Sequence, residues 1–279
     1  MAFLQVNLMS TALMRTVPVN VILPVDKPKV PGQAKREEKP YKTLYLLHGV
    51  IGSYVDWVNG TRIQRFAEDN NLAVVMPAGE NSFYVDHEGG AANYGEFVGK
   101  ELVELTRRMF PLSRKREDTF IGGLSMGGYG ALRNGLKYHD TFGFIVALSS
   151  AIITEEYNQR PYGLKGMFFE TREFAEKCFG DLSKLTKSDK DPRYLVKELK
   201  KKNIIFPKIY MACGEDDFLF AKNNDFVEFL KENDIEVTYD IGPGAHEWDF
   251  WDTYIKRAIE WLPLEQTQAG LGSGNIGNK

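Results

Sequence analysis

The sequence predicts an α/β fold in which a mostly parallel central sheet is flanked by helices. Short apolar segments alternate along the chain with segments of helical composition and period. Residues 43–49 form a continuous apolar run, which is typical of a strand covered by helices on both faces. Residues 118–138 have the pattern of a strand, a tight turn and a helix around Gly123-x-Ser125-x-Gly127.

The remaining elements follow in chain order. Residues 3–9 and 18–24 alternate apolar and polar side chains and are expected to pair as antiparallel strands at the start of the sheet. Further strands are expected at residues 72–76, 142–148, 204–213 and 235–241, and helices at 94–110, 128–138, 223–232 and up to Trp261. The polar run 26–39 is expected to be an exposed loop.

One domain is expected over residues 1–263, because no linker interrupts the alternation of strands and helices. A chain of 279 residues with 43% hydrophobic side chains is long enough to bury one large core. Periodicity weakens between residues 151 and 202, which indicates either a modest cap-like insertion over a site or ordinary helices on the sheet flank. The Gly-rich, polar residues 264–279 are expected to be a disordered tail.

The composition excludes several classes of partner. A formal net charge of -3 gives no electrostatic reason to expect nucleic acid or an anionic membrane. No apolar run is long enough to span a bilayer, and no His, Cys and carboxylate cluster has metal-ligand spacing, so no metal or organic cofactor is expected. The two cysteines, Cys178 and Cys213, favour a reducing, cytoplasmic location. The expected partner is a small molecule, and homo-oligomer formation is left open.

Ser125 is the candidate nucleophile. In a nucleophile elbow a strand ends, turns sharply and becomes a helix, which holds the serine at the tip in a strained conformation. Gly123 and Gly127 fit this turn because a Cβ there would clash where strand and helix approach. A phosphate-binding loop is disfavoured, since no lysine follows the glycines.

The general base follows by elimination. A serine hydroxyl needs an imidazole to accept its proton. In folds that carry a nucleophile elbow, the three residues follow one another along the chain in the order nucleophile, acid, histidine. Of the four histidines, His48 and His87 precede Ser125. His139 lies at the far end of the helix that starts at the serine, about 20 Å away. Only His246, in a Gly-Pro-Gly loop after a strand, remains.

The acid and the oxyanion donors come from turns at strand ends. Glu215, Asp216 and Asp217 follow the strand expected beside that of His246, and any one of them can accept from the imidazole. The turn His48-Gly49 ends the strand of residues 43–49 and is a source of one oxyanion-hole N–H group.

With these residues in place, the chain resembles α/β-hydrolases of the esterase D group, and most of all the bacterial tributyrin esterases. S-formylglutathione hydrolases and feruloyl esterases are related to this group. The resemblance covers the chain to about Leu264 and is carried by Leu4-Gln5-Val6-Asn7, Val19-Asn20-Val21-Ile22-Leu23-Pro24, Leu46-Leu47-His48-Gly49, Gly123-Leu124-Ser125-Met126-Gly127-Gly128-Tyr129-Gly130-Ala131-Leu132, Cys213-Gly214-Glu215-Asp216-Asp217-Phe218-Leu219 and Gly244-Ala245-His246-Glu247-Trp248.

The resemblance implies roles for particular residues. The family's acid stands directly before Phe-Leu, which selects Asp217. The family's oxyanion donors correspond to the N–H groups of Val50 and Met126. Independently of the resemblance, Ile51, Trp57 and Tyr84 are candidate substrate contacts, and for the loop that carries Tyr84 a packed surface loop is the alternative.

The implied activity is that of a serine carboxylesterase for short-chain acyl or acetyl esters. A thioesterase of the S-formylglutathione hydrolase type and a feruloyl or cinnamoyl esterase are the alternatives. The segment 48–52 departs from the cysteine-containing segment usual in S-formylglutathione hydrolases, which argues against a glutathione thioester. A binding module that has lost its activity is the non-enzymatic alternative.

Overall fold

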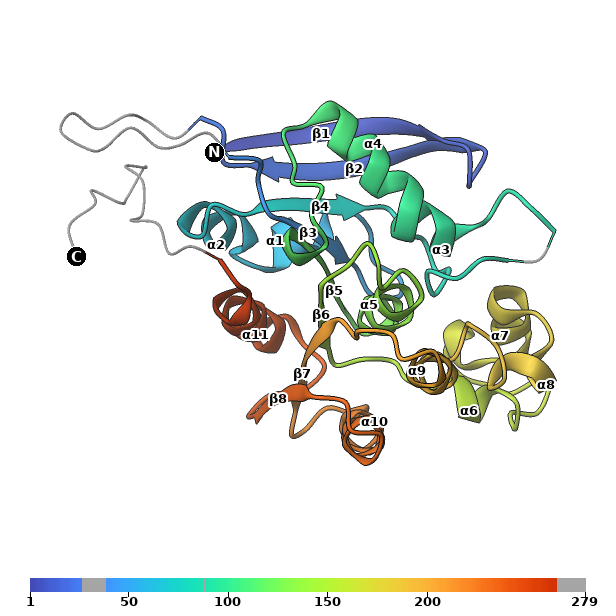
Figure 1. Ribbon diagram of the computed structural model, residues 1–279. Coiled ribbons are helices and arrows are strands. Elements are labelled where there is room, and N and C mark those ends of the chain that lie inside the picture. Colours follow the sequence, from blue (N-terminus) through green and yellow to red (C-terminus); the bar gives the residue numbers. More distant parts are fainter. Residues whose placement is uncertain (27–38, 88, 265–279) are drawn as a thin grey trace.

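The computed structural model describes residues 1–26, 39–87 and 89–264, and its described strands form one twisted sheet (Figure 1). The strands are β1 (Ala2–Ser10), β2 (Arg15–Leu23), β3 (Thr43–Leu47), β4 (Ala73–Pro77), β5 (Thr119–Leu124), β6 (Phe144–Leu148), β7 (Lys208–Gly214) and β8 (Val237–Gly242). Their order in the sheet is β1-β2-β4-β3-β5-β6-β7-β8. The pairs β1–β2 and β2–β4 are antiparallel, and all the others are parallel.

Helices cover both faces of this sheet (Figure 1). They are α1 (Asp56–Gly60), α2 (Ile63–Asp69), α3 (Tyr94–Glu96), α4 (Leu102–Met109), α5 (Met126–Lys137), α6 (Thr154–Tyr157), α7 (Arg172–Phe179), α8 (Leu182–Leu185), α9 (Pro192–Lys201), α10 (Phe220–Glu232) and α11 (Trp248–Trp261), with a π-helical turn η1 (Phe97–Glu101) and 3₁₀ turns η2 (Arg116–Asp118) and η3 (Phe168–Glu170). None of the described helices is long and apolar enough to cross a membrane.

The alternation of side chains along each strand divides the core into two layers. Tyr45 and Leu47 of β3 point to the layer that contains α4, α5, α9 and α10. Leu44 and Leu46 point to the opposite layer, with α2 and α11. Both sets are fully buried, because a central parallel strand has no solvent-facing side. The α/β class with a mostly parallel sheet is therefore confirmed.

Parallel strands bring the functional segments to one edge. β3, β5, β6, β7 and β8 all run in the same direction, so the turns at their carboxyl ends lie along the same side of the sheet. The candidate residues predicted after these strands are brought together from distant parts of the sequence in this way.

Most expected elements are present, with one instructive difference. The helix expected at residues 94–110 is divided into α3, the π-helical turn η1 and α4. An extra residue per turn changes which side chains face the core, and the apolar spacing of the sequence does not record it. The loop expected at 26–39 and the tail expected at 264–279 lie almost wholly outside the described residues.

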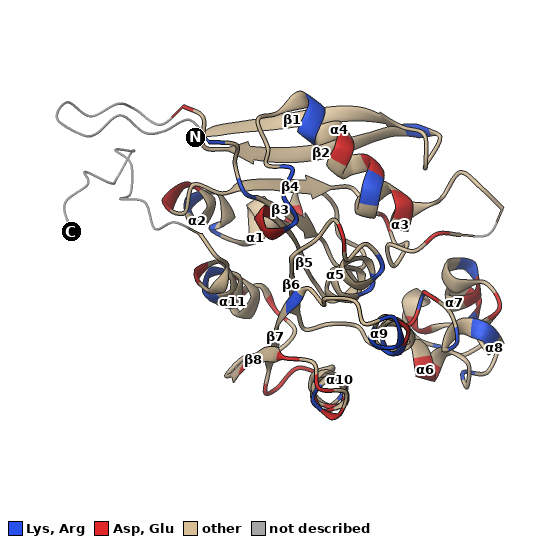
Figure 2. Ribbon diagram, in the orientation of Figure 1, with Lys and Arg blue, Asp and Glu red and all other residues tan. Residues whose placement is uncertain are grey.

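The segment 151–202 contains α6 to α9 and is joined to the nucleophile helix by an ion-pair network. The guanidinium of Arg133, in α5, is fully buried and donates to Asp189 Oδ2 at 2.8 Å. Lys137 contacts both Asp189 and Asp86. Elsewhere, acidic and basic residues are interspersed over the outer helices (Figure 2), as the small net charge predicts.

The glycine requirement of the elbow gives a test of the fold. A Cβ on Gly127 would lie 2.4 Å from Leu47 O and 2.6 Å from His48 O, and these are backbone atoms of a central strand end. Gly127→Ala should lower the free energy of unfolding by about 3 kcal/mol, measured by chemical denaturation.

Gly122→Ala is the matched control in the adjoining strand. Its Cβ would meet Val146 Cβ at 3.2 Å, Leu44 Cδ1 at 3.3 Å and Val146 O at 3.3 Å, and all three distances are longer than the backbone contacts at Gly127. We expect Gly122→Ala to lower the free energy of unfolding by about 1 kcal/mol or less. Equal costs at the two positions would contradict the close approach at the elbow.

Candidate active site

Ser125 stands between β5 and α5 in a strained conformation. Its φ of 54° and ψ of -118° lie outside the regions that side-chain-bearing residues ordinarily adopt. Its N–H donates to Leu148 O at 2.9 Å, and its carbonyl accepts from the N–H groups of Tyr129 and Ala151 at 3.0 Å. The neighbouring strand and helix thus hold the serine in this conformation, as a nucleophile elbow requires.

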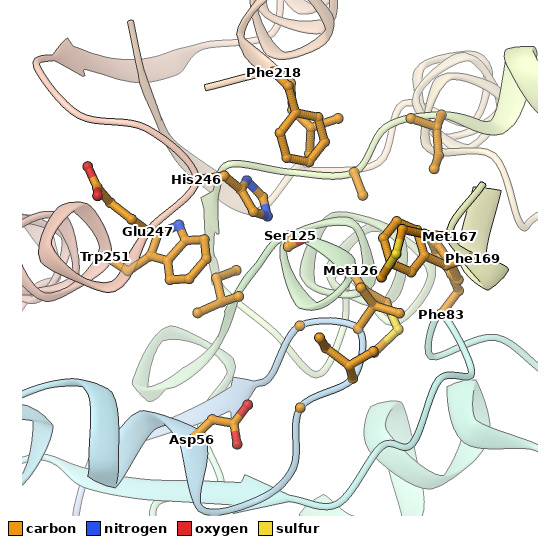
Figure 3. A pocket seen from close by; sticks show the side chains of 18 of the residues that line it. Asp56, Phe83, Ser125, Met126, Met167, Phe169, Phe218, His246, Glu247 and Trp251 are labelled. Carbon is orange, nitrogen blue, oxygen red and sulfur yellow. The ribbon is translucent and has the colours of Figure 1, made fainter. Parts of the chain in front are cut away.

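Asp217 and His246 are joined by a hydrogen bond across the β7 and β8 turns. His246 Nδ1 lies 2.9 Å from Asp217 Oδ2, and the Asp217 side chain has no exposed surface. Figure 3 shows the other imidazole nitrogen directed toward Ser125. The structure therefore brings the three predicted residues together at one site.

The carboxylate of Asp217 is stabilised in its charged form. Burial alone would raise its pKa, but hydrogen bonds from His246 and from the Leu219 N–H hold the pKa below its usual range. Glu215 and Asp216, the alternatives left open by the sequence, have exposed side chains. Their N–H groups bond Gly242 O and Gly244 O at 3.0 and 3.1 Å and so hold the two turns together.

Two residues that the sequence did not single out support the acid and the imidazole. Trp251 packs edge-on against the His246 ring with centroids 4.9 Å apart, and its indole N–H donates to Ser149 Oγ at 3.1 Å. The Ser149 hydroxyl in turn helps to lower the pKa of Asp217. Phe218 lies against the other side of the imidazole at 4.7 Å. A positive φ of 45° at Ser149 is the structural signal of this role.

The turn of residues 49–52 lies beside the nucleophile. Gly52 N–H donates to Gly49 O at 3.2 Å, and Ile51 has a φ of 58°. The Val50 N–H has no hydrogen-bond acceptor within the described part of the chain. Met126 is the first residue of α5, so its N–H has no acceptor within the helix. Both N–H groups belong to residues that line the cavity at Ser125.

The imidazole of His48 holds this turn through hydrogen bonds. Gly79 N–H donates to His48 Nε2 at 2.8 Å, so a neutral ring carries its proton on Nδ1 and donates it to Gly49 O at 2.7 Å. Burial lowers the pKa of His48, against a smaller opposing effect of the bond to Gly49 O. The histidine before the glycine is therefore a buried, neutral structural residue.

Ser125 opens into a cavity of about 580 Å³ (Figure 3). Its wall is mainly apolar and aromatic, and it includes Met167 and Phe169 from the predicted cap segment. Other lining side chains are Val50, Ile51, Phe83, Leu124, Met126, Ile153, Phe218, Leu219, Trp248 and Trp251. Besides His246, the ionisable lining residues are Asp56 and Glu247.

The expected contacts are corrected at two positions. Ile51 lines the cavity, but the lining described here does not include Trp57 or Tyr84. Trp57 is buried, and its indole N–H donates to Leu47 O at 2.9 Å. Tyr84 is fully buried, and its hydroxyl donates to His48 O at 2.9 Å. Each aromatic ring carries a polar group whose partner is a backbone carbonyl of the core, and this draws both inward.

No group of three or more His, Cys, Asp and Glu side chains in the described ranges is arranged to hold a metal ion. Cys178 and Cys213 are free thiols, and burial raises the pKa of each to about 12. Neither thiol is a nucleophile in this environment.

Solved structures with the same architecture include serine hydrolases and esterases. The S-formylglutathione hydrolase of Staphylococcus aureus superposes with a TM-score of 0.78 at 32% identity, covering 94% of this chain and 98% of that chain. A fluorophosphonate-binding serine hydrolase, also of Staphylococcus aureus and solved with substrate bound, gives 0.80 at the same identity and coverage. The α/β-hydrolase fold predicted from the sequence is confirmed.

The family is also clear from sequence comparison. The profile described as putative esterase matches residues 10–262, and the chain belongs to this esterase family. An acetyl esterase of Caldicellulosiruptor saccharolyticus is 49% identical over 262 residues, which are 94% of this chain and 98% of that protein. The protein is a carboxylic ester hydrolase.

The buried His48 predicts a pH dependence of stability. Because its pKa is lowered by folding, the unfolded chain binds the proton more readily below the unfolded value of about 6.5. The free energy of unfolding should therefore fall as the pH drops from about 6.5 toward the lower folded pKa. His48→Asn should flatten this slope in denaturation series between about pH 5 and pH 7.

His139→Asn provides the comparison, since His139 is part-exposed and outside the cavity. The free energy of unfolding of His139→Asn should change with pH as steeply as that of the wild type. If His48→Asn and wild type lose stability equally on acidification, the neutral buried imidazole is not the cause.

Proposed function

We propose that the protein is a serine carboxylesterase that hydrolyses short-chain acyl or acetyl esters through Ser125, His246 and Asp217. The observation that carries the proposal is the hydrogen bond between His246 and the buried carboxylate of Asp217, with the imidazole directed at a strained serine in an apolar cavity. The high identity to an acetyl esterase supports the short acyl group.

The proposed acylation step uses each group in turn. Ser125 Oγ attacks the ester carbonyl carbon while His246 Nε2 takes the hydroxyl proton. Asp217 accepts the Nδ1–H, which fixes the tautomer and stabilises the imidazolium. The carbonyl oxygen becomes an oxyanion, to which the N–H groups of Val50 and Met126 donate.

The tetrahedral intermediate then collapses. Its bond to the alcohol oxygen breaks, and His246 returns the proton to the departing alcohol, which leaves Ser125 acylated. A water molecule, deprotonated by the same imidazole, attacks the acyl carbon. As the second intermediate collapses, the bond to Ser125 Oγ breaks, the imidazolium returns its proton to Oγ, and the carboxylic acid is released.

The charge of the cavity favours a neutral ester over a glutathione thioester. Glutathione carries two carboxylates and one ammonium group. Apart from the imidazole, the ionisable lining residues are the carboxylates Asp56 and Glu247, with no lysine or arginine among the described lining residues. These two carboxylates would repel the anionic groups of glutathione in a partly enclosed cavity.

A feruloyl or cinnamoyl ester is the second candidate substrate. Phe83 and Phe169 line the cavity together with Met167, and aromatic walls of this kind can pack against a phenolic acyl group. We further propose that residues 151–202 act as a cap, since Met167 and Phe169 come from this segment.

A substrate panel tests the proposal. We would measure kcat/KM for p-nitrophenyl esters from acetate to decanoate, and for methyl ferulate and S-formylglutathione. The proposal expects the largest values among the acetyl to butyryl esters. A maximum with methyl ferulate or with the thioester would replace it by the corresponding alternative.

Ser125→Ala should lower kcat by about 10³- to 10⁶-fold, because covalent catalysis is lost while no core volume is removed. Unchanged melting temperature would show that the fold is intact. Residual activity within tenfold of the wild type would contradict the assignment of Ser125 as the nucleophile.

Asp217→Asn and Asp216→Asn form a matched pair of neighbouring changes. The first should lower kcat by about 10²- to 10⁴-fold, because an amide favours the wrong imidazole tautomer. The second should cost less than about tenfold, since the Asp216 side chain is exposed. Both are compared at saturating substrate, and the reverse order of damage would transfer the acid role to Asp216.

A further inference from the structure

We propose that Asn81 is a positioning residue for the oxyanion hole. Its side-chain oxygen holds the turn of residues 49–52 in the strained conformation that directs the Val50 N–H to the reacting carbonyl. This inference rests on the proposed function, because it takes Val50 as an oxyanion donor. The loop that carries Asn81 follows β4 and meets the turn only in the folded chain.

Ile51 is held in a conformation that its side chain opposes. A positive φ is uncommon for any residue with a Cβ, and a β-branched residue at 58° is a genuine outlier. The third position of such a turn usually carries glycine or asparagine. Packing does not explain the conformation, since the Ile51 side chain is 70% exposed.

The hydrogen bond from Ile51 N–H to Asn81 Oδ1 is 2.7 Å long. It is the contact from outside the turn that fixes the peptide unit between Val50 and Ile51. The peptide unit before it, which contains Gly49 O and the Val50 N–H, is fixed through its carbonyl by His48 Nδ1.

Because a peptide unit is planar, fixing the Gly49 carbonyl also fixes the opposite direction of the Val50 N–H. Asn81 and His48 thus hold two successive peptide units, and the Val50 N–H lies between their anchoring points. If Ile51 relaxed to a negative φ, the turn would change and Val50 would rotate away from the cavity.

The loop around Asn81 is itself well fixed, so its oxygen is a firm anchor. Ser82 Oγ donates to Gly79 O at 2.6 Å and accepts from Tyr84 N–H at 3.1 Å. The Cys178 thiol, in α7, lies 3.4 Å from Asn81 O. Gly79 also donates to His48 Nε2, so both anchors of the turn depend on this one loop.

The first experiment compares Asn81→Ala with Asn81→Asp on p-nitrophenyl acetate. Loss of the acceptor should lower kcat by about 10- to 100-fold, while KM changes less than about threefold, because the donor acts mainly in the transition state. Aspartate keeps an acceptor oxygen and should recover kcat to within about fivefold of the wild type.

Asn70→Ala is the matched control. Asn70 also bonds a backbone group through its amide, donating to Phe66 O at 2.9 Å, but this partner belongs to α2 and not to the turn of residues 49–52. The kcat of Asn70→Ala should equal that of the wild type.

An inhibitor gives an independent measurement. A trifluoromethyl ketone forms a tetrahedral adduct with serine, and it should bind Asn81→Ala more weakly by the same factor as kcat falls.

The second experiment tests the strain directly with Ile51→Gly. Glycine adopts a positive φ without steric cost, so the turn needs less support from Asn81. Asn81→Ala should therefore lose about tenfold less activity in the Ile51→Gly background than in the wild type. Equal losses in both backgrounds would show that Asn81 does not act by holding Ile51.

Ile51→Gly alone provides a measurement that does not depend on an Asn81 variant. Its melting temperature should not fall, because relief of the left-handed strain offsets the flexibility of glycine. A clear fall in the melting temperature of Ile51→Gly would contradict the proposed backbone strain at Ile51.

Failure of the inference differs from failure of the proposed function. If Ser125→Ala abolishes hydrolysis while Asn81→Ala keeps kcat within threefold of the wild type, the positioning role alone is refuted. If Ser125→Ala remains active, the proposed function fails first.

Discussion

The close approach of the nucleophile elbow to the end of β3 is the constraint on which the site depends. Gly127 lies so near Leu47 O and His48 O that no side chain fits between them. This contact places the start of α5 against the turn of residues 49–52. Met126 and Val50 consequently line the same cavity, although the two residues are far apart in sequence. The geometry of the proposed oxyanion hole thus depends on the packing of Gly127 against the end of β3.

Backbone strain gathers around this contact and is held by its surroundings. Ile51, Ser125 and Ser149 all have positive φ, and so do Phe83 and Tyr84 in the loop after β4. Such conformations persist only where neighbouring bonds and packing over-determine them. The bonds are present in each case described above: backbone pairing at the serine, the indole of a tryptophan at Ser149 and a carboxamide at Ile51. The site is therefore rigid at the atoms that the proposed mechanism requires.

The sequence predicted those parts of the site that local pattern or chain order records. Ser125 lies in a spaced glycine motif, and His246 was the only histidine after it at a suitable distance. The choice of Asp217 needed the resemblance, because three adjacent carboxylates have the same local pattern. Trp57 was misplaced because an aromatic residue after an active-site turn can pack inward as readily as outward. Ser149 and Asn81 act through contacts made only in the folded chain, which no periodicity encodes.

The cavity wall has two parts, one that carries the proposed reacting groups and one that comes from the segment 151–202. The proposed reacting groups stand on turns at the carboxyl ends of β3, β5, β7 and β8, and the sheet holds these turns in register. Met167 and Phe169 come from the segment 151–202, whose link to α5 is an ion-pair network around Arg133. Substitutions at Met167 and Phe169 can reshape this part of the wall without moving the Asp217–His246 pair. Divergence of substrate preference among similar esterases is physically easiest there, because neither the elbow nor the oxyanion turn needs to change.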